Sequence, residues 1–155
     1  MADDQSLRAE AVAWALRMVA GIADRGEVIA WADGAILVST IPPDWLVTVS
    51  LGSRLSEDRL VRMLCPTECR PVDGEALVQF FRALQEAWAG SKLTGPVIAR
   101  TLYEMLQIGF LPARLDGVIY HLDDAYELEV GGFVPGRAAE KALADLLRQE
   151  SAAAS

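Results

Sequence analysis

The ionisable residues with the most suggestive spacing lie near position 120, where acidic side chains are concentrated. Residues 114–130 contain five carboxylates and one arginine. Three of them, Asp116, Asp123 and Glu127, are seven and four residues apart, so in a helix they align along one face. Carboxylates gathered on one face speed association with a basic partner. We therefore expect an exposed partner-binding face formed by Asp116, Asp123, Asp124 and Glu127, with a solubilising acidic surface as the alternative.

Catalytic chemistry is poorly represented in the sequence. The only histidine, His121, has a carboxylate three residues further along, at Asp124. Such a pair can act as a general base and the group that orients it. However, the chain has no G-x-S-x-G motif, no phosphate-binding glycine loop and no H-E-x-x-H pair. We expect a surface histidine and no catalytic residue, and an enzyme of unrecognised type is only the third functional hypothesis.

The two cysteines form a C-x3-C pair, Cys65 and Cys69. A structural zinc site needs four ligands, usually Cys or His, and His121 is the only other ligand of this kind. The D-x-D-x-D-G spacing of a calcium loop is also missing. The sequence therefore predicts two free thiols in a loop, no bound metal and no cofactor.

The overall composition indicates an acidic globular protein. The chain has 155 residues, of which 52% are hydrophobic and 23% charged, and this predicts a single helical domain over residues 1–150 with a disordered tail at 151–155. The net charge is −8, from 22 acidic and 14 basic side chains. Because no basic stripe is present, nucleic acid and anionic membranes are not expected as partners. A basic protein surface is the expected partner.

The first residues lack the basic and apolar segments of a signal peptide. No uncharged apolar run reaches the 18 residues that a membrane-spanning helix needs. Two cysteines are also too few for the disulfide framework of a small secreted domain. The expected location is therefore the cytoplasm.

The elements that position these side chains are predicted to be helices. Three predicted helix starts share the spacing of a hydrophobic staple, in which a second apolar residue comes five positions after the first. The three pairs are Leu55 and Leu60, Val72 and Leu77, and Leu93 and Ile98. Apolar periodicity and these starts together predict helices at about 5–23, 57–65, 74–89, 95–108, 113–130 and 137–149. The first is expected to start with a cap from Ser6 and to end at Asp24-Arg25-Gly26.

The segment 27–51 has only three charges and two of the four tryptophans, so the rest of the chain should pack on it. Its Asp33-Gly34 pair could form a hairpin turn, and β-branched residues in 36–41 and 47–49 favour strands. Its neighbours are helical, which favours a helix–loop–helix. We expect an all-α fold, a compact orthogonal bundle of about seven to eight helices. The alternative is an α+β fold with a small three-stranded piece at 28–51.

Two strings, Val28–Asp33 and Pro42–Leu46, resemble small uncharacterised bacterial all-helical proteins that carry a Trp-Ala-Asp helix and then a Pro-Pro-x-Trp helix. The chain is also similar in style to small acidic immunity proteins that neutralise secreted toxins. The resemblance implies a helical 27–51 segment and a bacterial cytosolic setting, and it assigns no site residue. The leading functional hypothesis is a non-catalytic protein-binding module, an immunity or inhibitor protein for a basic toxin. A self-associating structural or adaptor protein is the alternative.

Overall fold

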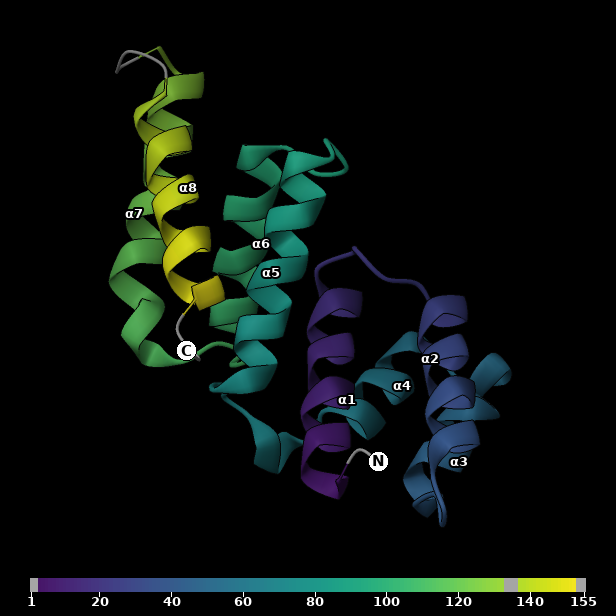
Figure 1. Ribbon diagram of the computed structural model, residues 1–155. Helices are drawn as coiled ribbons and strands as arrows, with labels where there is room; N and C mark the ends of the chain where they lie inside the picture. Colours follow the sequence, from purple (N-terminus) through teal and green to yellow (C-terminus); the bar gives the residue numbers. More distant parts are fainter. Residues whose placement is uncertain (1–2, 133–136, 153–155) are drawn as a thin grey trace. The chain divides into compact units, whose positions relative to one another are not determined.

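The structure is a computed structural model that describes residues 3–132 and 137–152. These residues form eight α-helices and three short 3₁₀ helices, and no strand occurs among them (Figure 1). The expected all-α fold is therefore confirmed, whereas the alternative three-stranded piece at 28–51 is wrong. The helices cluster into two compact units, Met1–Arg70 and Pro71–Ser155. The single domain expected over residues 1–150 stays a prediction.

The first unit contains four α-helices. α1 packs against α4, and α2 packs against α3 (Figure 1). The elements are α1 (Asp4–Val19), α2 (Arg25–Val38), α3 (Asp44–Ser50), η1 (Gly52–Arg54), α4 (Glu57–Leu64) and η2 (Thr67–Cys69).

Segment 27–51 forms a helix–loop–helix because both of its helices have strong start signals. The Asp24 carboxylate accepts a hydrogen bond from the Glu27 amide at 2.8 Å and so caps α2. Pro43, at φ −65°, directly precedes α3. These local signals prevail over the β-branched composition of 36–41 and 47–49.

Both ends of the first helix differ from the expectation. The C-terminal end differs because Asp24 caps the next helix, α2, and Gly26 lies inside α2 rather than terminating α1. α1 ends instead at Val19, and the chain turns at Gly21, which has a φ of +76°. At the other end, Asp3 rather than Ser6 is the cap: its carboxylate accepts a hydrogen bond from the Ser6 amide at 2.6 Å.

One arginine joins three helices of the first unit. Arg8 on α1 donates a hydrogen bond from Nη1 to the carbonyl oxygen of Met63 on α4, at 3.1 Å. Its guanidinium also lies 4.3 Å from the centre of the Trp45 ring on α3, a cation–π contact. Arg8 thus fixes α1 against both α3 and α4.

The second unit contains the other four α-helices, which are α5 (Glu75–Ala89), α6 (Gly95–Gln107), α7 (Asp116–Val130) and α8 (Ala138–Ala152), with η3 (Ala113–Leu115) before α7. α5 packs on α8, α6 packs on α7, and α7 also packs on α8 (Figure 1). Fully buried side chains, including Phe80, Phe81 and Leu102, fill the space between them.

The expected helices of this unit are present, with shifted ends. α5 is capped at Gly74, which has a φ of +71°, one residue later than the Val72-Asp73 staple predicts. α8 continues through Ser151 and Ala152, so these two residues do not belong to a disordered tail. Ser151 is also held to α5, because its carbonyl oxygen accepts a hydrogen bond of 3.0 Å from Arg82 Nε. The rest of the expected tail, 153–155, lies outside the described residues.

In the second unit, Arg114 forms ion pairs with two carboxylates from different elements. Glu150 on α8 is only 6% exposed, and its Oε1 lies 2.8 Å from Nη2 of Arg114 on η3. The same nitrogen lies 3.0 Å from Oδ1 of Asp73, which precedes α5. The hydrogen bond from Arg114 lowers the pKa of Asp73, and both carboxylates raise the pKa of Arg114. One side chain therefore connects the approach to α5 with the end of α8.

Close packing between α6 and α7 leads to a first expectation. A Cβ atom at Gly95 would collide with the hydroxyl of the buried Tyr126. We expect Gly95→Ala to lower the free energy of unfolding of this unit by about 1–3 kcal/mol, because overpacking forces neighbouring side chains to move. Urea denaturation followed by the ¹H–¹⁵N NMR signal of the indole of Trp88, the only tryptophan of residues 71–155, measures this change.

Gly117→Ala is the matched control, because a Cβ atom there meets nothing within 4 Å. In α7, alanine should leave stability unchanged or raise it slightly. Equal effects of the two substitutions would contradict the close contact at Gly95.

Candidate functional site

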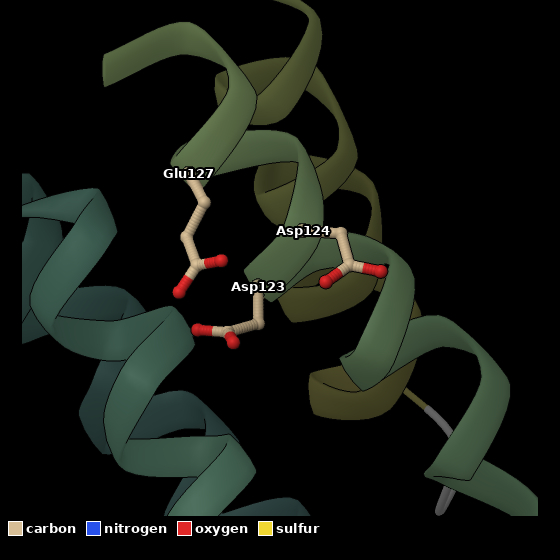
Figure 2. Close-up of side chains that lie close together, drawn as sticks. All are labelled: Asp123, Asp124 and Glu127. Carbon is tan, nitrogen blue, oxygen red and sulfur yellow. The ribbon is translucent and has the colours of Figure 1, made fainter. Parts of the chain in front are cut away.

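The acidic face predicted from the sequence lies beside the seam between α6 and α7. α7 turns Ile119, Leu122 and Tyr126 into the core of its unit. Three of the four predicted residues come together next to this buried stripe: Asp123, Asp124 and Glu127, called the acidic trio from here on. Each offers a carboxylate oxygen within 4.8 Å of the oxygens of the others. Figure 2 shows Asp123 and Glu127 extending toward each other, with Asp124 on the other side of Asp123.

Asp123 does not have the exposure that the sequence led us to expect. It is 7% exposed, and its Oδ2 accepts a hydrogen bond of 3.3 Å from Nη1 of Arg100 on α6. The physical reason is its place on the helix: position 123 is four residues after Ile119 and three before Tyr126, so it shares their face. Asp123 is therefore a paired, structural carboxylate.

The other predicted residues differ from one another. Asp124 and Glu127 are exposed, as expected. Asp116 is half-buried and is not part of the trio. It lies in the first turn of α7, where the partial positive charge of the helix N-terminus favours a carboxylate. Only two of the four predicted residues thus combine proximity with exposure.

Three residues of α6, Arg100, Tyr103 and Gln107, contact α7 and were not predicted from the sequence. Arg100 forms an ion pair with Glu104 at 3.6 Å, and its guanidinium lies 5.0 Å from the centre of the Tyr103 ring. The Tyr103 ring meets the Tyr120 ring of α7 edge to face, with centroids 5.5 Å apart. Gln107 donates a hydrogen bond of 2.7 Å to the Tyr120 hydroxyl. The spacing of Arg100, Tyr103 and Gln107 is the signal in the sequence that could have identified them, because it places all three on one helix face.

This arrangement can bind cations more readily than it can do chemistry. The acidic trio supplies three carboxylates, whereas Ca²⁺ takes six to eight oxygen ligands. Asp123 already forms an ion pair with Arg100, so a metal ion would have to compete with Arg100 for this carboxylate. His121 is exposed on α7 and does not belong to the trio.

The cysteine pair is divided between two environments. Cys65 ends α4 and is fully buried, whereas Cys69 lies in η2 and is half-buried; both are free thiols. Burial raises the pKa of Cys65, which lowers the fraction of its reactive thiolate. In the part of the chain that the structure describes, the only cluster of potential metal ligands is the acidic trio.

Comparisons with protein-family models, with curated proteins and with solved structures gave no match. Within the described ranges, no helix has the length and apolar character needed to traverse a bilayer.

The different roles of neighbouring carboxylates can be tested by stability measurements. We expect Asp123→Lys to lower the free energy of unfolding by about 1–3 kcal/mol, because it breaks the ion pair with Arg100 and places a second cation beside it at a buried position. Urea denaturation of the purified protein measures the change.

Asp124→Lys makes the same change in charge one residue away and is the control. Because Asp124 is exposed, we expect an effect within about 0.5 kcal/mol. If both variants were equally stable, Asp123 would not be the buried and paired carboxylate described above.

Proposed function

We propose that this protein is an acidic, non-catalytic binding module of the immunity or inhibitor type, which acts in the bacterial cytoplasm and neutralises a basic toxin through α7. The observation that carries the proposal is the pair of exposed carboxylates, Asp124 and Glu127, beside a buried carboxylate that is already neutralised.

The proposal rests on two exposed carboxylates, those of Asp124 and Glu127. Among the described residues, neither Asp124 nor Glu127 forms an ion pair. Asp123 and Arg100 fix the helix that carries them, so the charges are presented from a rigid element. Preorganised charges of this kind increase the rate of encounter with an oppositely charged surface.

The charge of the whole second unit favours the same class of partner. Residues 71–155 contain 12 acidic and 7 basic side chains. A basic protein is therefore attracted from a distance, and the α7 face then gives it two defined anchoring points. Both contributions weaken as salt rises, because exposed charges are screened beyond about 10 Å at 0.1 M ionic strength.

Charge reversal on α7 tests the proposal once the cognate partner has been isolated with the wild-type chain. We expect Asp124→Lys combined with Glu127→Lys to lower the association rate constant by roughly tenfold at low salt. Surface plasmon resonance measures the rate, and raised salt should slow the wild-type association in the same way.

Glu75→Lys combined with Glu86→Lys is the matched control. Both residues are exposed on α5 of the same unit, so the net charge changes equally at a different place. We expect a much smaller effect on association. If the two double variants associated at equal rates, total charge alone would attract the partner, and the α7 face would not be the site.

A second candidate function, self-association as a structural or adaptor protein, is favoured by exposed apolar side chains in the first unit. Leu37 on α2 is 86% exposed, and Ile41, just after α2, is 87% exposed. Val38 and Leu51 are also largely exposed. Apolar side chains of this size, exposed together, are typical of interfaces between proteins.

Sedimentation velocity distinguishes this candidate. Self-association predicts a wild-type dimer and a Leu37→Lys, Ile41→Lys variant that sediments as a monomer with unchanged helix content. A wild-type monomer at every concentration would exclude it.

A further inference from the structure

A cavity of about 350 Å³ lies between α1 and α2 in the first unit. Its volume is at the lower end of the range of roughly 300–1,000 Å³ that small-molecule sites occupy. Three lining residues, Ala30, Gly34 and Val38, are exposed, so the cavity opens to solvent on this side of α2. The lining consists of Leu7, Glu10, Ala30, Trp31, Gly34, Ala35, Val38 and Ser39.

The lining is apolar except at two points, which is the usual composition of a small-molecule site. Ser39 already donates a hydrogen bond of 2.7 Å from Oγ to the carbonyl oxygen of Ala35. Glu10 is the only ionisable residue among the described residues that line the cavity. The cavity therefore has a single charge, which is negative.

Two lining residues, Glu10 and Trp31, are hydrogen-bonded to each other. The Trp31 indole donates a hydrogen bond from Nε1 to Oε2 of Glu10, at 2.8 Å. A carboxylate has about four acceptor positions, so it can accept a further donor after this bond. The Trp31 ring also contacts the Trp14 ring, with centroids 6.3 Å apart, and the Arg17 guanidinium lies 4.6 Å from the Trp14 ring centre. These contacts orient the aromatic wall before any ligand arrives.

Gly34 is an exposed glycine of α2 that lines the cavity. Glycine in a helix interior costs about 0.5–1 kcal/mol relative to alanine, so it needs a reason. Packing is not the reason, because a Cβ atom at Gly34 would meet nothing within 4 Å. Gly34 lies inside α2 and lines the cavity, and any longer side chain there would reduce the space.

We propose that this cavity binds a small apolar cation, namely an aromatic or aliphatic body that ends in a protonated amine. The body lies against Trp31, Leu7 and Val38, and the ammonium group donates hydrogen bonds to Glu10. An anion of the same size is repelled by the same carboxylate. The site lies in the first unit and requires no protein partner, so it is independent of the function proposed for α7.

Titration with 2-phenylethylamine, followed by ¹H–¹⁵N NMR of the tryptophan indoles, tests the inference. The Trp31 indole signal, assigned with the Trp31→Phe variant, should shift and saturate at concentrations on the order of 1 mM, as suits a ligand of this size. The Trp88 indole belongs to the other unit and should not move. 2-Phenylethanol should bind roughly tenfold more weakly, and phenylacetate more weakly still.

Two variants test separately how the charge of Glu10 and the volume of the cavity contribute to binding. Glu10→Gln keeps an acceptor for the Trp31 indole but removes the charge, so the amine should bind no better than the alcohol. Gly34→Leu fills the cavity, and it should abolish binding of both while leaving the melting temperature unchanged or higher. The inference would be overturned if the wild type bound 2-phenylethylamine and phenylacetate equally well. It would also be overturned if the Trp31 signal did not shift up to the solubility limit of the amine.

Discussion

A carboxylate buried between helices is stable only where a cation and hydrogen bonds replace the water that it loses. The second unit satisfies this requirement twice. Glu150 is buried near the end of α8, and Arg114 neutralises it while also reaching Asp73 before α5. Asp123 is buried on α7, and Arg100 of α6 neutralises it. The ends and the middle of this helix packing therefore depend on two arginines, in addition to the apolar core.

This requirement also determines which charges the protein presents to its surroundings. Counting acidic residues along α7 overstates the charge of its surface, because Asp123 and Arg100 offset each other. What remains at this point is the charge of Asp124 and Glu127, which lie next to the paired Asp123. A structural ion pair thus reduces the amount of exposed charge but defines its position.

Local signals were sufficient to predict most of the fold. Helix caps and staples depend on residues within one turn, so the starts near Ser56, Gly74 and Thr94 could be predicted. The helix–loop–helix of 27–51 was predicted from its helical neighbours, whereas the cap of α2 at Asp24 was not recognised. The burial of Asp123 follows from its spacing to Ile119 and Tyr126, but its pairing with Arg100, 23 residues away, could not be predicted, because it depends on how α6 packs on α7. The cavity was missed for a related reason: in the sequence Gly34 suggested a turn, and only the packing of α1 beside α2 shows that it lines a space.

The position of Arg8 has a consequence for how the first unit opens. Its guanidinium lies on Trp45 of α3 and its hydrogen bond ends on Met63, in the last turn of α4. That turn would ordinarily fray, because the final carbonyl groups of a helix have no partner within it. Here fraying of α4 would also break the attachment of α1. The backbone amides of α1 and α4 should therefore exchange with solvent through a shared opening, as one cooperative unit rather than as separate helices.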